Sequence, residues 1–170
     1  MDDLHIRKGT IKDIPAFYPL FKNSMHKQFT EYTVTTRDYF TDMSYTEAAI
    51  RQQLSGELIN LFLAFHKEQV IGFFLTQKPT GGVSMAIWLA VHEDFQKHGA
   101  ATELLGLWEE IALVEGAHAL QIWTRDHNIP FYKHRGFRLV GEFPQAWYRV
   151  DVSLLYKTIA EPQEIKYLRR

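Results

Sequence analysis

One stretch of the sequence limits the fold more than any other, because it leads from an apolar strand through small residues into a long amphipathic helix. It reads AVHEDFQKHGAATELLGLWEEIA, residues 90–112, with QKHGAA at residues 96–101. Beyond this turn Leu104, Leu105 and Trp108 recur at the spacing of one helix face. Glycine and alanine at a helix start allow another molecule to approach the backbone. The pattern therefore predicts a strand, a turn and a helix, with a ligand at the turn.

The chemistry of that ligand follows from the backbone. The first N–H groups of a helix lack an acceptor within the helix, and the helix dipole adds partial positive charge, so the two together bind phosphate. The Lys and Ser or Thr of a Walker loop are missing after Gly99, and the upstream hairpins argue against the parallel βαβ unit of a dinucleotide fold. A metal-free pyrophosphate site remains, open to a bulky anion at Gly99, Ala100 and Ala101.

The rest of the chain alternates between strand-like and helix-like patterns, which predicts a mixed α/β fold. Short connections between successive apolar runs favour antiparallel hairpins, and apolar residues on both strand faces favour helices on each side of the sheet. The segment 26–46 has no clean period. Strands are predicted at residues 4–9, 58–65, 70–76, 84–91, 118–124, 137–143 and 148–159. Helices are predicted from Thr10 to about Asn23, up to Leu54, after Gly99, and between Pro130 and Gly136.

Composition excludes several classes of protein. The 170 residues, 46% hydrophobic and 23% charged, suit one domain over residues 1–160 with a C-terminal tail at 161–170. No apolar run is long enough for a membrane span, and no secretory signal opens the sequence, so we expect a cytoplasmic protein without a membrane partner. A net charge of −1 indicates no nucleic-acid partner. The absence of cysteine and of any paired-histidine helix motif predicts no metal site.

At this point the sequence resembles a known family. LAVHEDFQKHGAATELL is similar to the acyl-CoA signature of the GNAT superfamily of N-acyltransferases, Q/R-x-x-G-x-G/A after an L-x-V strand. IRKGTIKDIPAFYPLF, PFYKHRGF and DVSLLYK resemble further parts of the family, so the likeness covers about residues 4–158. It implies the GNAT-like acyl-CoA N-acyltransferase fold, an α/β (α+β) architecture whose mixed central sheet of about seven strands has helices on both faces.

The resemblance also implies a reaction and a cofactor site. Acetyl-CoA would donate its acetyl group directly to an amine in a ternary complex, without a metal, and the absence of cysteine agrees with direct transfer. Backbone near Leu89 and Val91 would face the pantetheine arm and the thioester oxygen, and the amides after Val91 would hold the pyrophosphate. Lys97 and His98 either add charge at the rim or are simply solvated. The implied pyrophosphate residues are Gln96, Lys97, His98, Gly99, Ala100, Ala101 and Thr102.

Tyr132 is the catalytic candidate that the resemblance supplies. It lies four residues before Gly136, where the family usually has a tyrosine near the CoA sulfur. A phenol of pKa near 10 keeps its proton at neutral pH and can donate it to a departing thiolate. The alternative is that Tyr132 only packs in the core. The cofactor-contacting asparagine of relatives, seven residues before this tyrosine, is Arg125 here, which leaves Asn128 as a candidate for that contact.

The general base and the acceptor are left open. Met85 and Trp123 stand where relatives have a glutamate base, and neither can accept a proton. Glu31, His26, His92 or Asp126 could act through water. Substrate recognition in the family falls to the segments that are residues 26–46 and 141–147 here. Aromatic residues in the first segment either line a pocket for a cationic or aromatic amine or pack in the core. The acceptor is a small molecule or a peptide amine, and the protein a monomer or a homodimer.

Two other classes of function compete. A non-catalytic acyl-CoA-binding sensor on the same fold would explain the missing acids at the usual base positions. A hydrolase would use Ser84, because residues 82–86 fit a relaxed G-x-S-x-A nucleophile elbow. That elbow requires the serine to lie at a turn before a helix, whereas the sequence predicts that Ser84 enters a strand.

Overall fold

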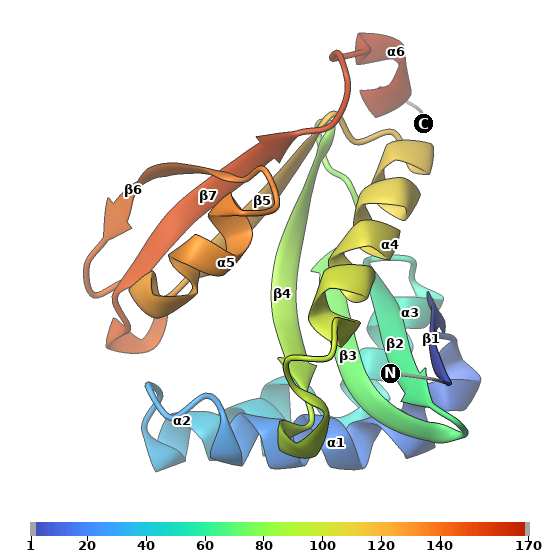
Figure 1. The fold of residues 1–170 in the computed structure, drawn as a ribbon, viewed down its shortest axis with the longest axis vertical. Helices are drawn as coiled ribbons and strands as arrows, with labels where there is room; N and C mark the ends of the chain where they lie inside the picture. Colours follow the sequence, from blue (N-terminus) through green and yellow to red (C-terminus); the bar gives the residue numbers. More distant parts are fainter. Residues whose placement is uncertain (1–2, 169–170) are drawn as a thin grey trace. The chain divides into compact units, whose positions relative to one another are not determined.

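The computed structural model describes residues 3–168 and contains one mixed sheet of seven strands with helices (Figure 1). The hydrogen-bonded order of the strands is β1-β2-β3-β4-β5-β7-β6. The strands are β1 (Leu4–Lys8), β2 (Ile59–His66), β3 (Gln69–Gln77), β4 (Val83–Val91), β5 (Ala119–Thr124), β6 (Arg138–Phe143) and β7 (Val152–Thr158). The helices are α1 (Ile14–Lys27), α2 (Val34–Tyr39), α3 (Glu47–Ser55), α4 (Ala100–Val114), α5 (Ile129–Lys133) and α6 (Glu164–Tyr167). The α/β fold class and the mixed sheet predicted from the sequence are confirmed.

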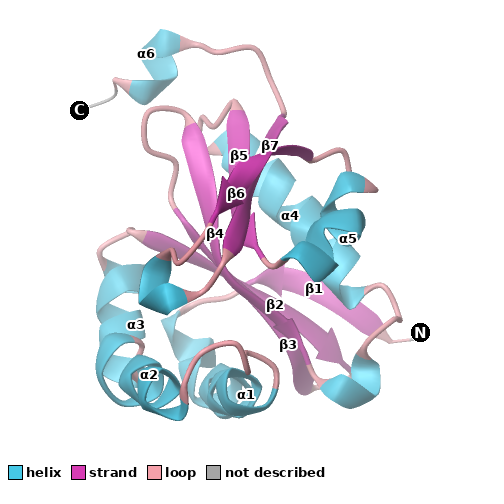
Figure 2. Ribbon diagram, turned by 90° about the vertical axis from the view of Figure 1, so that its left-hand side faces the viewer, coloured by secondary structure: helices cyan, strands magenta, loops and turns pink. Residues whose placement is uncertain are grey.

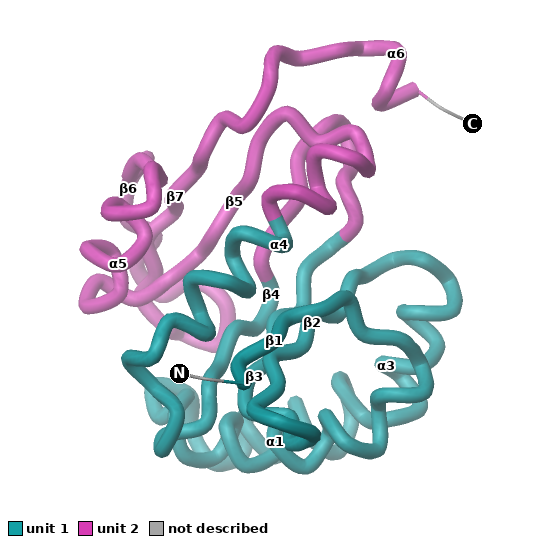
Figure 3. Tube along the Cα trace, turned by 45° about the vertical axis from the view of Figure 1, so that its right-hand side comes forward, with its two compact units in different colours: residues 1–77, 87–108 teal, residues 78–86, 109–170 magenta. Residues whose placement is uncertain are grey.

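The chain divides into two compact units (Figure 3). Unit 1 contains the residues up to Gln77 together with Ile87–Trp108, and unit 2 contains Lys78–Ala86 with the residues from Glu109 onwards. Both β4 and α4 continue from one unit into the other. The prediction of one domain over residues 1–160 stays a prediction.

Unit 1 is built on strands β1, β2 and β3, which pair antiparallel in that order. Leu63 of β2, for example, lies opposite Phe73 of β3. Helices α1, α2 and α3 lie together on one face of these strands (Figure 2). Adjacent residues of β3 point to opposite faces. Phe73 therefore packs against Phe17 of α1, while Phe74 packs against Trp108 of α4. The two apolar faces of the predicted strands are thus both covered in unit 1.

Unit 2 contains a parallel strand pairing. Val83, Ser84 and Met85 of β4 pair with residues 119–121 of β5. The other edge of β5 pairs antiparallel with β7 along its whole length, and the far edge of β7 carries β6. A crossover through α4 is what allows β4 and β5 to run parallel, because parallel neighbours cannot be joined by a tight hairpin.

Three segments differ from the sequence prediction. Residues 26–46 contain the short helix α2 and a π-helical turn at Phe40–Ser44, where no regular element was predicted. The last strand begins at Val152 rather than at residue 148, because Tyr148 and Arg149 have φ of 57° and 62° and cannot continue a strand. The C-terminal segment includes α6, whose Tyr167 contacts the ring of His118 at 5.2 Å between centroids.

Candidate functional site

The end of β4 is held closely against β3 in unit 1. The amide of His92 donates to the carbonyl oxygen of Ile71 at 2.7 Å. A Cβ on Gly72 would lie 3.2 Å from Cγ2 of Val91 and 3.3 Å from the carbonyl oxygen of Ala90. Glycine at this position therefore allows β4 to approach β3. This packing fixes the strand from which the QKHGAA turn departs.

Two glutamine side chains fix the path of the chain after β4. Nε2 of Gln28 and Nε2 of Gln96 each donate to the carbonyl oxygen of Val91 at 3.1 Å. Gln96 Nε2 also lies 3.3 Å from Oε1 of Gln28, so the two carboxamides support one another. The side chain of Gln96 thus holds the turn onto β4, while its backbone amide donates to the carbonyl oxygen of Glu93 at 3.4 Å.

The turn between β4 and α4 uses two left-handed residues. Lys97 has φ of 65° and Gly99 has φ of 93°. The first described bond of the helix runs from the amide of Glu103 to the carbonyl oxygen of Gly99 at 3.0 Å, which makes Gly99 the residue that caps α4. In this geometry the amides of Ala100 and Ala101 have no acceptor within the helix.

The space in front of this helix start is open. A Cβ built on Gly99 meets no described heavy atom within 4 Å, although the positive φ would strain any side chain there. The side chains of Lys97 and His98 are exposed, and Ala100 is buried beneath the turn. Helix-start amides without an acceptor in the helix, a positive helix end, the exposed ammonium of Lys97 and free space suit a diphosphate group. The residues present therefore fit the pyrophosphate of an acyl-CoA.

Tyr132 is a buried residue of α5 in unit 2. Its ring packs edge-on against Phe131 and Phe137, with centroids 5.0 and 5.8 Å apart. Burial raises the pKa of Tyr132 to about 12, and two weaker influences oppose this rise. One is a hydrogen bond with the hydroxyl of Thr124, and the other is the positive charge of Arg135. At neutral pH the group is therefore a phenol that can donate a hydrogen bond.

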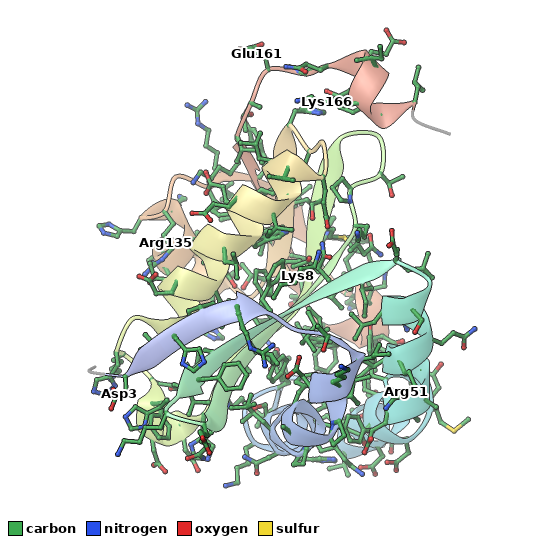
Figure 4. The ribbon with its side chains drawn as sticks, turned by 90° about the vertical axis from the view of Figure 1, so that its right-hand side faces the viewer. Asp3, Lys8, Arg51, Arg135, Glu161 and Lys166 are labelled. Atoms are coloured by element: carbon green, nitrogen blue, oxygen red, sulfur yellow. The ribbon has the colours of Figure 1, made fainter. Side chains whose placement is uncertain are left out.

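Arg135, labelled in Figure 4, follows α5 in a turn in which its amide donates to the carbonyl oxygen of Tyr132 at 2.9 Å. Its guanidinium lies over the ring of Phe131, 3.6 Å from the centroid, and its Nη1 donates to the carbonyl oxygen of Phe131 at 2.7 Å. Burial lowers the pKa of Arg135, yet the group stays charged because its ordinary pKa is far above neutral. A fixed cation beside the phenol makes Tyr132 a better acid than burial alone would.

Asn128 and Asp126 precede α5. The backbone amide of Asn128 donates to the carbonyl oxygen of Arg125 at 2.9 Å, so Asn128 closes a turn at the start of the helix. Asp126 accepts a hydrogen bond from the hydroxyl of Ser153 at 2.9 Å. Ser153 is fully buried and lies opposite Thr124 in the pairing of β5 with β7. Among the four base candidates, Asp126 is the one placed in the same unit as Tyr132.

The other candidates for acid–base work lie in unit 1. His92 accepts a hydrogen bond from the amide of Asp94 at 3.3 Å and so caps a short turn after β4. Nδ1 of His26 lies 3.9 Å from a carboxylate oxygen of Asp38, and Glu31 is half-buried. Met85 and Trp123 occupy strand positions on β4 and β5.

The hydrolase alternative fails on the position of its nucleophile. Ser84 is fully buried as the second residue of β4 and pairs with Leu120, so it is neither exposed nor at a turn before a helix. Within residues 3–168 no group of three or more His, Asp or Glu side chains is placed to hold a metal ion. In the same residues no helix is long and apolar enough to cross a membrane.

The structure adds three side chains that sequence reasoning missed at these sites. They are Gln28, which holds the turn after β4, and Thr124 and Arg135, which act on Tyr132. Gln28 is the C-cap residue of α1, far from Val91 in sequence, and no local sequence pattern links the two. Arg135 belongs to the PFYKHRGF motif three residues after Tyr132, and this short spacing was the one signal in the sequence that the two side chains could interact.

Solved acetyltransferases share this fold. The PaiA N-acetyltransferase from Thermoplasma acidophilum, solved with coenzyme A, has 16% identity and a TM-score of 0.75 over 91% of this chain and 98% of its own. An acetyltransferase of the GNAT family from Streptococcus pneumoniae has 18% identity and a TM-score of 0.74 over 92% and 99%. A probable acetyltransferase from Staphylococcus epidermidis has 15% and 0.74 over 91% and 98%. No curated protein matches the sequence.

The sequence itself assigns the family. The model of the acetyltransferase (GNAT) family matches residues 17–137, which include the QKHGAA turn and Tyr132. The chain belongs to the acetyltransferase (GNAT) family, and the resemblance noted from its motifs is confirmed.

Proposed function

We propose that the protein is an N-acetyltransferase that moves an acetyl group from acetyl-CoA to a primary amine within a ternary complex. The observation that carries this proposal is the start of α4, where Gly99 faces open space beside amides that the helix leaves without acceptors. Membership of the GNAT family supports the use of an acyl-CoA. The finer assignment of donor and acceptor rests on the chemistry of the residues.

Acyl-CoA binding is assigned to the end of β4 and the turn that follows. The amides from Gln96 to Thr102 bind the pyrophosphate, with Lys97 and His98 adding positive charge at its rim. Backbone near Leu89 and Val91 faces the pantetheine arm and the thioester oxygen. Gln28 and Gln96 keep this backbone in place through their shared bonds to the carbonyl of Val91. Asn128 remains a candidate for a further contact with the cofactor.

The proposed reaction needs no covalent enzyme intermediate. The amine nitrogen attacks the thioester carbonyl carbon and forms a tetrahedral oxyanion. The carbon–sulfur bond then breaks, the acetyl group stays on nitrogen, and the proton lost by nitrogen is balanced by the proton gained by sulfur. Because neither Met85 nor Trp123 can accept that proton, it leaves the nitrogen through water or through Asp126.

Tyr132 is proposed to assist the departing thiolate. With a pKa of about 12, its phenol is a weaker acid than an ordinary thiol, whose pKa is about 8.5. Complete proton transfer from Tyr132 to the thiolate would therefore be uphill by roughly 5 kcal/mol. The phenol is better suited to donate a strong hydrogen bond to sulfur as negative charge develops. Thr124 and Arg135 favour this donation because both lower the pKa of Tyr132.

A non-catalytic acyl-CoA sensor is the second candidate. The residues that favour it are Met85 and Trp123, because both usual base positions lack a proton acceptor. A sensor would bind acetyl-CoA at the same turn and would transfer nothing. A buried phenol held by Thr124 and Arg135 has no purpose in simple binding, and this favours the enzyme.

Calorimetric titration with acetyl-CoA and with desulfo-CoA tests the binding part of the proposal. Gly99→Glu places a carboxylate in the open space before α4 and should abolish binding of both compounds. Gly106→Glu is the matched control, because Gly106 lies in the same helix and a Cβ there also meets no described atom within 4 Å. The control adds the same charge away from the turn and should keep the affinity of the unchanged protein.

The outcomes separate the candidates. Metal-independent binding that only Gly99→Glu abolishes supports the pyrophosphate site, and release of free CoA with a panel of amines then supports the transferase over the sensor. Binding without transfer to any amine supports the sensor. Failure of the folded, unchanged protein to bind either CoA compound would refute both.

A further inference from the structure

A cluster of aromatic rings surrounds Trp88 of β4 in unit 1. The side chain of Trp88 is 9% exposed. The rings of Phe29 and Phe40 lie 5.0 and 5.2 Å from it between centroids, and those of Tyr32 and Tyr45 both lie at 5.9 Å. All four come from the segment between α1 and α3. We call these five residues the Trp88 cluster.

The indole N–H of Trp88 has no hydrogen-bond partner among residues 3–168. A buried tryptophan normally finds an acceptor for this group, since an unmade bond in an apolar site is destabilising. The cluster around it supplies ring faces and edges, and the nearest rings are phenylalanines. The buried donor is therefore suited to an oxygen that arrives with another molecule.

The segment that carries the rings is irregular, and three of the four rings are partly exposed. Phe29, Tyr32 and Tyr45 are only partly buried where they pack against the core. Phe40 begins the π-helical turn at Phe40–Ser44, a conformation that is rare and often found at functional sites. The partly buried rings of Phe29, Tyr32 and Tyr45 are therefore the side from which we expect a ligand to approach Trp88.

The charges of the segment argue for an uncharged ligand body. The carboxylate of Asp42 lies 3.5 Å from Nζ of Lys22, and Asp38 lies 3.9 Å from His26. Nη1 of Arg37 donates to the carbonyl oxygen of His26 at 2.6 Å. Asp42 and Asp38 thus lie beside basic side chains, Arg37 is bound to a backbone carbonyl, and the members of the cluster itself are aromatic and uncharged. If the ligand carried a second ammonium group besides its reacting amine, that group would meet ring faces but no buried carboxylate in the cluster. If it carried a carboxylate, that group would meet a segment of net negative charge.

We propose that the Trp88 cluster binds the acceptor and selects a primary amine with an aromatic body that carries a neutral oxygen, such as a phenol. The ring of the acceptor packs against Phe29 and Tyr32, and its oxygen accepts the hydrogen bond of Trp88 Nε1. This proposal rests on the proposed N-acetyltransferase function and deepens it by naming the class of acceptor. A site with a buried donor rejects an analogue that lacks the acceptor more strongly than an apolar pocket rejects a change of size.

Paired amines test this assignment. Tyramine and phenethylamine differ only in the hydroxyl, and cadaverine is a diamine without a ring. The unchanged protein should give a kcat/KM for tyramine at least tenfold above that for phenethylamine, with cadaverine poorer than both. Trp88→Phe keeps a ring and removes the N–H, so the two aromatic amines should become equivalent within about twofold.

Trp108→Phe is the matched control variant. Trp108 is a second buried tryptophan of unit 1, which packs against Phe74 on the other face of the sheet, so its substitution removes the same volume. This variant should keep the tenfold preference for tyramine. Thermal unfolding of both variants checks that they fold. Titration of tyramine into the complex with desulfo-CoA gives a readout that does not depend on turnover, and Trp88→Phe should weaken that binding about tenfold.

The results separate two failures. If acetyl-CoA does not bind, the proposed function fails and the acceptor assignment falls with it. If acetyl-CoA binds and amines are acetylated, but tyramine and phenethylamine react equally well or cadaverine is preferred, only the acceptor class is wrong. An unchanged preference in folded Trp88→Phe would likewise overturn the role of the indole N–H.

Discussion

The hydroxyl of Thr124, the last residue of β5, donates a hydrogen bond to the phenolic oxygen of Tyr132 in α5 and thereby lowers the pKa of the phenol. Thr124→Val removes this donor with little change in volume. The pKa of Tyr132 should rise further, and the weaker acid should lower kcat about fivefold, in line with about 1 kcal/mol for one hydrogen bond. Steady-state release of free thiol measures the effect.

Thr124→Ser is the control for this bond, because it keeps the hydroxyl and removes only a methyl group. It should restore most of kcat, and neither variant should change the KM for acetyl-CoA. A purely structural role for Thr124 predicts the opposite pattern, with similar losses in both variants and no dependence on the hydroxyl.

Tyr132→Phe removes the proposed hydrogen bond to the departing thiolate. We expect kcat to fall about 100-fold, the lower end of the range for a positioned proton donor. Calorimetric affinity for acetyl-CoA should stay within about twofold of the unchanged protein. The control is Tyr156→Phe on β7, which removes an exposed phenol from the same unit and should leave kcat as it is. Full activity in Tyr132→Phe would remove Tyr132 from the mechanism.

The two carboxamides on the carbonyl oxygen of Val91 should matter for cofactor affinity. Gln28→Ala and Gln96→Ala each remove one bond of 3.1 Å that holds the backbone before the QKHGAA turn. Each should weaken acetyl-CoA binding about fivefold, since a partly buried hydrogen bond contributes about 1 kcal/mol. Because the two side chains also contact one another, the double variant should lose less than the product of the single losses. If all three variants bound acetyl-CoA with the affinity of the unchanged protein, this account of the turn would be contradicted.

The sequence predicted the elements whose residues carry a period or a turn signal. The apolar face through Leu104, Leu105 and Trp108 predicted α4, and Gly99 predicted where it starts. The structure of segment 26–46 was not predicted, because its aromatic residues follow neither a helical nor an alternating spacing. A π-helical turn also has no local sequence pattern of its own. The start of β7 was predicted too early, because the residue types of Tyr148 and Arg149 give no sign of a left-handed backbone.

Only those residues of the candidate site that belong to a single local sequence motif could be predicted. Gly99 and Tyr132 belong to recognisable local patterns, so both were singled out. Gln28 acts on Val91 of β4 from the C-cap of α1, and Thr124 acts on Tyr132 from the preceding strand. Such pairs depend on how elements pack, which hydrophobic periodicity does not fix. Trp88 read as an ordinary apolar strand residue, and its indole N–H acquired meaning only once its surroundings were known.

The last prediction concerns acid stability through Asp13. Nη1 and Nη2 of Arg7 bond both carboxylate oxygens of Asp13 at 2.9 and 2.6 Å, and the amide of Thr10 adds a bond of 2.8 Å. The hydrogen bonds from Arg7, with those from Thr10, lower the pKa of Asp13 from 3.8 to about 2. Since the folded state holds the ionised form, this stabilisation is complete above pH 4 and is lost as the pH falls through about 2.

Urea unfolding of the unchanged protein and of Asp13→Asn measures how much the ionised carboxylate of Asp13 stabilises the fold. Because Arg7 is 44% exposed, solvent screening reduces the effect, and we expect a difference in unfolding free energy of about 1 kcal/mol at pH 6. The difference should shrink between pH 4 and pH 2, where Asp13 takes up its proton. Glu68→Gln, a neutralised exposed residue of the turn between β2 and β3, should change the free energy little at either pH. A difference for Asp13→Asn that stays constant down to pH 2 would show that the carboxylate charge contributes nothing.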